Sequence, residues 1–477
     1  MSVTTPNATP ASTAGSATAA AGTPVGPTPD ATGAQPGQQA VDARSGLSRI
    51  AAISATLVST YALTSVLGLA FWLLAARQFS IGAVGVGGAA VSLMTLVGTF
   101  GTVGLGTLLI SRLPRTDQGH RRVLVRTALA LAGTVAGVLA VVVPLVAIRG
   151  FGATNLEAVA GSPSTLALFA VGTALMAVGL VADQAVLVLG SGRLQTERNT
   201  VASVTKLVVL VALAAAGQEG GMTIFLAWTI GTLASLPLVA WRTRGGRALE
   251  DGSKLIDPRR LRGLGRLALS HHALNTTLQA PLQILPLLVL VVVSSRENGI
   301  FTTALQVTGV VFTLPYAITV GLFASAEGDE RAVLDRMKFT LPVSLGLSVL
   351  ANLLLFPLAP YVLRVFGSQY STEGVTILRV LALAGLFFVV KDHFVALRRV
   401  QERTTSATLV MLGMTVAELV AAYVGLRITG TAAGLAVGWV CVLAVEALVL
   451  SLPLAVAARP GLLSRIPIPV RRNRSAT

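Results

Sequence analysis

The sequence predicts an all-α polytopic membrane protein with about 12 transmembrane helices arranged in two six-helix bundles. The chain has 477 residues, 53% hydrophobic and 12% charged, with a mean hydropathy of +0.76. Soluble proteins carry about 25% charged residues, so this composition excludes a soluble fold of this size. The apolar residues are also gathered into long runs, and a run of about 20 residues crosses a hydrocarbon core about 30 Å thick.

The apolar runs, separated by short charged stretches, give the predicted spans in chain order. They cover residues 50–76, 83–110, 123–148, 165–189, 199–216, 222–241, 268–293, 299–324, 339–360, 375–394, 405–426 and 431–456. The segments between them are too short to form a domain outside the bilayer.

The distribution of basic residues predicts how the chain is oriented. With the amino terminus inside, the cytoplasmic segments hold 28 Lys and Arg residues and the outer segments hold 6. Basic residues are enriched in the cytoplasmic loops of membrane proteins, so both termini are predicted to lie in the cytoplasm. This bias also accounts for the net charge of +16 without nucleic-acid binding, through contact with water and anionic lipid.

Composition and loop length predict five segments. The first 48 residues are rich in Ala, Thr, Pro and Gly and have few bulky apolar side chains, which is typical of disorder. The longest cytoplasmic loop separates two groups of six spans, as in transporters built from parallel repeats. The predicted segments are a disordered tail 1–48, an N-terminal bundle 49–241, a basic linker 242–267, a C-terminal bundle 268–458 and a basic tail 459–477.

An internal offset of 214 residues relates the two bundles. It aligns Gly85 with Gly299 and the first span with the seventh. In each half a long span, a very short outer turn and a second long span then follow in the same order. The agreement lies in spacing and hydropathy rather than in identity. It favours two homologous six-helix units.

The short loops argue against an enzyme. The longest outer connections, 149–164 and 361–374, each hold one acid, Glu157 and Glu373, whereas membrane polymerases need several acid, base or metal-binding groups there. No phosphate-binding G-x-x-x-x-G-K-[ST] segment occurs, and the single cysteine, Cys441, cannot form an internal disulfide or a metal cluster. We expect no catalytic residue, no metal and no cofactor.

Two charged residues stand out in the fourth and fifth spans. Charges at membrane depth are costly and normally face a cavity or each other. Asp183 and Lys206 lie on consecutive antiparallel spans joined by a short loop, so they can pair. A structural ion pair and a role in substrate binding or ion coupling both remain open.

A polar face runs along the start of the seventh span. Because such a stripe is unfavourable in lipid, we expect it to line a cavity, with helix packing as the alternative. Pro281 and Pro286 remove backbone donors and permit bending, so this helix is a candidate gate. The residues of the face are His271, His272, Asn275, Thr276, Gln279 and Gln283.

The first span carries a milder polar stripe that includes Thr60 and Thr64. The offset of 214 residues places it over the stripe of the seventh span. Hydroxyl residues often serve helix packing in membranes, but the repetition favours a cavity bounded by both bundles.

Three further candidate residues in the last three spans are charged. Lys391 is near the cytoplasmic end of the tenth span, where snorkelling to the headgroups or binding of an anion can explain it. Glu418 and Glu446 lie near the middle of the last two spans. Each is either a neutral, hydrogen-bonded core carboxyl or a coupling site for a proton or cation.

Residues 71–115, FWLLAARQFSIGAVGVGGAAVSLMTLVGTFGTVGLGTLLISRLPR, resemble the opening of bacterial polysaccharide-transport flippases. The similar features are the LAARQFS exit from the first span, the glycine-rich second span and the basic SRLPR loop. These O-antigen-type lipid-linked oligosaccharide flippases share the multidrug/oligosaccharidyl-lipid/polysaccharide exporter superfamily with multidrug extruders and lipid II flippases. The first span has no charge between residues 50 and 76, unlike that of lipid II flippases.

The resemblance implies a multidrug-extruder-like V-shaped fold in the bacterial cell membrane, with a central cavity between spans one, two, seven and eight. It also implies alternating access that moves a polyprenyl-pyrophosphate oligosaccharide from the inner to the outer leaflet for cell-surface polysaccharide biosynthesis. Expected partners are this lipid-linked glycan, membrane lipid, and glycosyltransferases and a polymerase of the same pathway.

A hydrophilic, cationic cavity suits this cargo. We expect His271, His272, Lys206 and Lys391 to receive the pyrophosphate, and Asn275, Gln279, Gln283, Thr60 and Thr64 to bind sugars. The alternatives are a drug/cation antiporter of the same fold, coupled through Asp183, Glu418 or Glu446, and a membrane scaffold for glycan-synthesis enzymes that does not transport.

Overall fold

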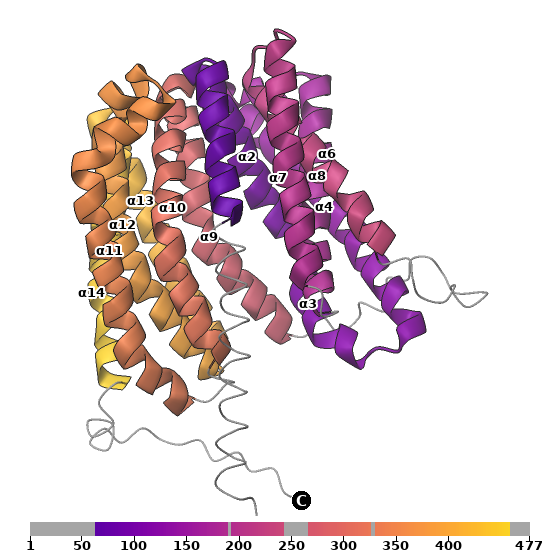
Figure 1. Ribbon diagram of the computed structural model, residues 1–477, viewed down its shortest axis with the longest axis vertical. Helices are drawn as coiled ribbons and strands as arrows, with labels where there is room; N and C mark the ends of the chain where they lie inside the picture. Colours follow the sequence, from indigo (N-terminus) through magenta and orange to yellow (C-terminus); the bar gives the residue numbers. More distant parts are fainter. Residues whose placement is uncertain (1–62, 189–191, 243–265, 326–329, 458–477) are drawn as a thin grey trace, which may run out of the picture. The chain divides into compact units, whose positions relative to one another are not determined.

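The computed structural model describes residues 63–188, 192–242, 266–325 and 330–457 (Figure 1). These segments are helical apart from short turns. The helices are the first helix, Leu63–Gln78, then α2 (Ile81–Gly101), α3 (Leu105–Arg112), η1 (Leu113–Arg115), α4 (Gln118–Phe151), η2 (Thr154–Leu156), α5 (Glu157–Ala160), α6 (Pro163–Val188), α7 (Gly192–Ala215), α8 (Gly221–Arg242), α9 (Arg266–Val292), α10 (Ser295–Ser325), α11 (Glu330–Phe366), α12 (Ser368–Val400), α13 (Thr404–Thr429) and α14 (Ala432–Ala457).

These helices confirm the predicted fold class of a multi-pass, all-α membrane protein. Within the described residues, ten helices are long and apolar enough to cross a bilayer. The first helix overlaps the second part of the first predicted span, whose residues 50–62 lie outside the described residues, and α10 coincides with the eighth predicted span. The predicted tails 1–48 and 459–477, residue Thr60, and residues 243–265 of the predicted linker lie outside the described residues.

The second predicted span is not one helix. The run expected over residues 83–110 is divided into α2 and α3, because Val103 (φ 47°) and Gly104 (φ 74°) take left-handed backbone conformations. Glycine adopts this conformation without the steric strain of a Cβ atom. A glycine at position 104 therefore permits a break within an otherwise apolar run.

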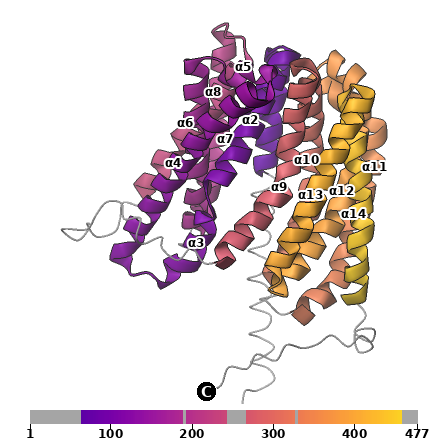
Figure 2. The same cartoon turned by 180° about the vertical axis from the view of Figure 1, so that it is seen from behind.

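The two halves of the chain cross at equivalent glycines. We call residues 63–242 the N-half and residues 266–457 the C-half. α2 of the N-half packs against α9 and α10 of the C-half (Figures 1 and 2). A Cβ atom on Gly85 would collide with the carbonyl of Ser295, and one on Gly299 would collide with that of Ile81. The offset of 214 residues predicted from the sequence thus relates two positions that meet at this crossing, where small residues allow close backbone approach.

Hydrogen bonds join the halves toward one end of the bundle. We call this the short-loop end, where the first helix ends and α2 and α10 begin; the opposite end, where α9 begins, is the basic end. Asn298 Nδ2 donates to the Gly85 carbonyl at 2.7 Å, and Arg77 Nε donates to the Val365 carbonyl at 2.7 Å. Asn155 Nδ2 donates to the carbonyl of Leu290 at 2.9 Å.

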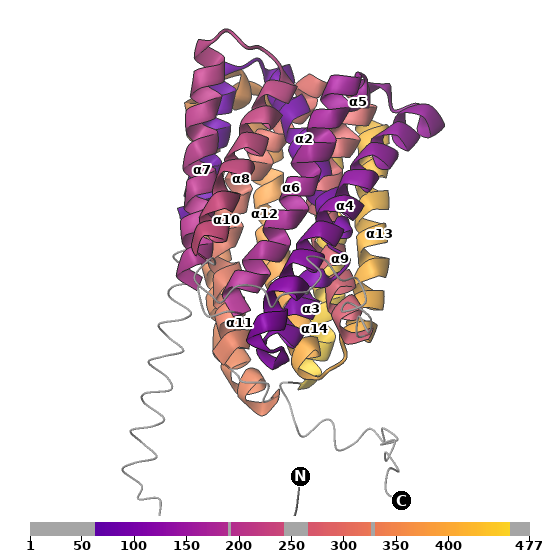
Figure 3. The same ribbon diagram turned by 90° about the vertical axis from the view of Figure 1, so that its right-hand side faces the viewer.

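At the basic end, α9 lies between the halves. Figures 2 and 3 show its first turns near α3 of the N-half and beside α13 of the C-half. The Thr415 hydroxyl donates to the Thr277 carbonyl at 3.1 Å, which ties α9 to α13. The proline-containing helix expected to act as a gate therefore packs on the C-half and borders the N-half.

The first helix contributes to the apolar cores of both halves. Phe71 and Trp72, at 0% and 1% exposure, pack with Phe225 and Met94 in the N-half. Ala76, one turn later, packs into the large C-half cluster. The apolar side chains of this helix determine which of its faces is buried in each half. They place Phe71 beside Lys206 of α7.

Candidate functional site

Asp183 of α6 pairs with Arg198 of α7, not with Lys206. Arg198 Nε donates to Asp183 Oδ1 at 2.7 Å and Nη2 donates to Oδ2 at 2.6 Å. Both side chains are nearly buried, at 8% and 13% exposure. The predicted Asp183–Lys206 pair is wrong because Arg198, in the second turn of α7, binds the Asp183 carboxylate through two hydrogen bonds.

Lys206 instead lies against aromatic rings. Its Nζ is 3.8 Å from the centre of the Trp228 ring and 5.5 Å from that of Phe71. No described carboxylate forms an ion pair with it. The ring faces stabilise the ammonium through cation–π attraction but leave its positive charge uncompensated.

The polar stripe of α9 is partly open. Asn275 and Gln279, one turn apart, are exposed, while His271, His272 and Gln283 are half-buried. Arg399 of α12 donates from Nη2 to Asn275 Oδ1 at 2.5 Å. Arg399 therefore adds a cation to this face of α9 near the basic end.

Lys391 of α12 is enclosed by two carboxylates. Its Nζ donates to Glu418 Oε1 of α13 and to Glu446 Oε2 of α14, the latter at 3.1 Å. The side chains of Lys391, Glu418 and Glu446 are 4%, 0% and 5% exposed. Snorkelling of Lys391 to the headgroups is thus excluded, and its charge is already balanced, which removes the basis for assigning it to anion binding.

The two carboxylates of this cluster differ in their partners. Glu418 also accepts a hydrogen bond from Trp439 Nε1 at 2.7 Å, so both of its oxygens are bound. Glu446 Oε1 is buried without a hydrogen-bond partner among the described residues. One lysine between two glutamates leaves one negative charge in excess when all three are ionised.

The polar stripe of the first helix is described only in part. Thr64 is half-buried and has interactions of its own. The neighbouring Ser65 shares a 3.1 Å hydrogen bond with Thr313 of α10. This contact crosses from the N-half to the C-half, so at least one hydroxyl of the first helix serves packing.

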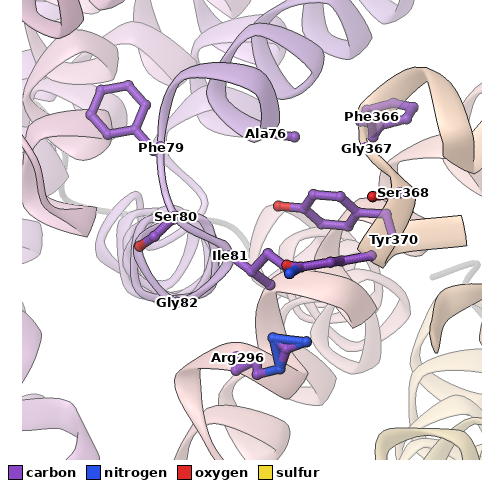
Figure 4. A pocket seen from close by; sticks show the side chains of 11 residues that line it. Ala76, Phe79, Ser80, Ile81, Gly82, Arg296, Phe366, Gly367, Ser368 and Tyr370 are labelled. Atoms are coloured by element: carbon purple, nitrogen blue, oxygen red, sulfur yellow. The ribbon is translucent and has the colours of Figure 1, made fainter. Parts of the chain in front are cut away.

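A pocket of about 420 Å³ lies at the short-loop end (Figure 4). Ala76 and residues 79–82 of the N-half form one wall, and Arg296 and residues 366–370 of the C-half form the other. Arg296 is bound to Glu373 at 2.5 Å. Figure 4 shows the Tyr370 side chain crossing the pocket toward Ala76 and Ile81. This pocket lies away from the α9 stripe, and a central cavity remains a prediction.

The structure also supplies residues that the sequence did not single out. Arg198, Trp228, Arg399 and Trp439 each contact a predicted residue. The two tryptophans lie in apolar runs, where aromatic side chains commonly belong to the core. The two arginines were assigned to cytoplasmic loops by the charge pattern, although each lies on a helix and reaches another.

Comparison with solved structures shows which fold this is, whereas no known protein family and no curated protein matches the sequence. A multidrug resistance MATE family transporter of the MOP superfamily, in its inward-facing conformation, gives a TM-score of 0.65 at 14% identity, covering 84% of this chain and 96% of that chain. Its outward-facing conformation gives 0.59 at 15% identity, covering 87% and 96%. A MATE structure in the straight conformation gives 0.59 at 14% identity, covering 86% and 96%. The chain therefore has the fold of the MATE family transporters of the MOP superfamily.

Proposed function

We propose that this protein is an alternating-access flippase that moves a polyprenyl-pyrophosphate oligosaccharide from the inner to the outer leaflet for cell-surface polysaccharide biosynthesis. The observation that carries the proposal is Lys206, whose positive charge lies inside the N-half without a described carboxylate partner. A charge at this depth is expensive unless it has a function or a partner. An anionic pyrophosphate is the complementary ligand.

The acid of the N-half does not offset this charge. Asp183 is neutralised by Arg198 through two hydrogen bonds. A cationic drug would need an uncompensated carboxylate, whereas the uncompensated group near Phe71 and Trp228 is positive. The charge in this half therefore favours anionic cargo.

The exposed face of α9 suits the sugar part of the cargo. Asn275 and Gln279 present amide groups on one face, and amides both donate to and accept from hydroxyl groups. His271, His272, Gln283 and Thr64 extend the proposed contact set, with Thr60 as a further member from the sequence. Arg399, bound to Asn275, adds a positive charge where cargo from the cytoplasm would enter.

A drug/cation antiporter of the same fold is the second candidate. It is supported by the fold shared with multidrug resistance MATE transporters and by the excess carboxylate in the cluster of Lys391, Glu418 and Glu446. In either function, Glu418 and Glu446 are the proposed coupling residues for a proton or cation. Asp183 is the weaker candidate, because Arg198 already balances its charge.

The experiment uses sealed proteoliposomes that contain the full chain and a fluorescent polyprenyl-pyrophosphate oligosaccharide. The rate at which label in one leaflet becomes accessible to an impermeant quencher measures flipping. We expect protein-dependent flipping that the double substitution His272→Ala with Gln279→Ala abolishes, while the protein remains in the membrane. Flipping unchanged by this pair would overturn the α9 assignment.

A second arm separates the two candidate functions. The same liposomes are tested for uptake of a fluorescent lipophilic cation, such as ethidium, with and without a proton or sodium gradient. Gradient-driven cation transport together with no glycan flipping would replace the flippase by the antiporter. Absence of both activities would favour a membrane scaffold for glycan-synthesis enzymes.

A further inference from the structure

Buried side-chain oxygens without a protein partner are confined, in the part of the chain that the structure describes, to one half of the molecule. Among the described residues, the side-chain oxygens that are buried and make no hydrogen bond all lie in the C-half. They belong to Thr276, Ser344, Ser348, Asn352, Tyr370 and Glu446. In the N-half, buried hydroxyls such as those of Thr173 and Thr229 donate to backbone carbonyls one turn earlier.

Three of these oxygens form a row on α11. Ser344, Ser348 and Asn352 follow one another at steps of four residues, so they share one face of the helix. Their exposures are 0%, 1% and 8%. This is the face that packs into the C-half, because α11 also buries Val333, Ala359 and other apolar residues there.

The two serines behave differently from neighbouring hydroxyl residues. A serine or threonine inside a helix can donate to the carbonyl four residues earlier, as Thr303 does to Gly299 at 2.9 Å and Thr308 does to Ala304 at 3.0 Å. Ser344 and Ser348 make no such bond. Their hydroxyls are buried but remain available to another partner.

Asn352 completes the row with a free acceptor. Its Nδ2 donates to the Ser348 carbonyl at 2.9 Å and to the Ala382 carbonyl of α12 at 3.2 Å. This geometry fixes the amide and leaves Oδ1 without a partner. Toward the basic end the polar face continues one turn before Ser344, where Thr340 Oγ1 lies 3.2 Å from His393 Nε2.

Three adjacent buried polar groups without hydrogen bonds would be energetically costly if no water were bound to them. Each buried polar group left without a hydrogen bond costs about 1–3 kcal/mol. Buried polar groups that lack a protein partner are normally satisfied by ordered water. Four residues of helix rise by about 6 Å, and a single water that hydrogen-bonds two neighbouring groups connects positions at about this spacing.

We propose that a file of bound water runs along the buried face of α11 from Thr340 to Asn352, inside the C-half. It extends over about 18 Å at a rise of 1.5 Å per residue and ends toward the basic end beside His393. The row itself contains hydroxyls and one amide but no carboxylate, which favours neutral water over a metal cation. The inference does not depend on which substrate the protein carries.

Hydroxyl-radical footprinting of the full chain in lipid nanodiscs tests this directly, because radicals formed from bound water modify adjacent side chains. We expect residues 340–352 and the facing residues 382–393 to be modified at least threefold faster than residues 84–94 of α2. The α2 segment is the matched control, since it is buried in the N-half and none of its described side-chain oxygens is both buried and unpaired. The double variant Ser344→Ala with Ser348→Ala should reduce labelling to the control rate. Equal labelling of both segments in the wild-type protein would overturn the proposal.

Thermal unfolding gives an independent result. If water fills the row, the double alanine variant unfolds at a lower temperature, because the remaining water and Asn352 lose hydrogen bonds. If the row is dry, the same variant is unchanged or more stable, because two unsatisfied hydroxyls have been removed. A sodium-dependent rise in the unfolding temperature, absent with choline and lost in the double variant, would replace water by a bound cation. None of these measurements requires transport, so they are separate from the test of the proposed function.

Discussion

Arg198 holds Asp183 through two hydrogen bonds of 2.7 and 2.6 Å, and the Ser235 hydroxyl of α8 lies 3.3 Å from Arg198 Nη1. Three helices of the N-half therefore meet at one guanidinium group. Because both charges are nearly buried, each needs the other, and the pair links the local order of α6, α7 and α8.

Asp183→Asn should destabilise the protein by about 3 kcal/mol, because removing one partner of a buried ion pair leaves an uncompensated charge. The thermal unfolding temperature in detergent measures this effect. The double variant Asp183→Leu with Arg198→Met should recover most of the loss, since well-packed apolar residues can replace a buried pair. If the double variant folds but does not transport, Asp183 has a role beyond structure.

The two glutamates of the C-half cluster should differ in their effect on stability. Glu418→Gln should lower the free energy of unfolding by about 3 kcal/mol, because Glu418 binds both Lys391 and Trp439. Glu446→Gln should lower the free energy of unfolding by about 1 kcal/mol or less, since only one of the Glu446 oxygens has a hydrogen-bond partner. Unfolding temperatures of the two purified variants provide the comparison, and equal losses would contradict the difference in bonding.

Lys206→Met should separate transport from stability. Removing a half-buried charge that lacks a described counter-ion relieves its desolvation cost, so the unfolding temperature should stay constant or rise. Flipping of the pyrophosphate-linked glycan should fall by roughly tenfold or more, because a hydrogen bond to a charged group contributes about 1.5–3 kcal/mol. Lys206→Arg, which keeps the charge, is the matched control. The opposite pattern, lower stability with normal flipping, would make Lys206 a structural cation–π partner of Trp228.

Gly85→Leu should open the short-loop end. A Cβ at this position already meets the backbone of Ser295 and Gly299, and overpacking typically costs about 1–3 kcal/mol. The reporter is Thr302→Cys, a buried α10 position next to Gly88, in a Cys441→Ser background. We expect an impermeant maleimide to label it at least tenfold faster when Gly85→Leu is present.

Gly309→Leu on α10 is the control for this prediction, because nothing lies within 4 Å of a Cβ built there. It should leave the labelling rate of Thr302→Cys unchanged. Equal acceleration by both substitutions would show that the crossing of Gly85 and Gly299 does not close this end.

The spans and their order could be predicted from the sequence, because hydropathy is a local property and a helix satisfies its backbone groups within one segment. The offset of 214 residues between Gly85 and Gly299 could also be predicted, from the matching spacing of spans and loops in the two halves. The break at Val103 and Gly104 was not, because glycine is compatible with both a continuous membrane helix and a left-handed turn.

The sequence by itself determined which residues carry charge inside the membrane, and only the tertiary structure decided their partners. Arg198 and Lys206 both lie on α7, about 12 Å apart along its axis at 1.5 Å per residue, and the packing of α6, α7 and α8 places Arg198 on the Asp183 carboxylate and Lys206 against Trp228. The sequence alone assigns Lys391 to an apolar helix. Its pairing with Glu418 and Glu446, however, requires three helices to converge. Span position follows from about 20 consecutive residues, whereas an ion pair depends on the relative rotation and depth of separate helices, which the packing of their whole surfaces sets.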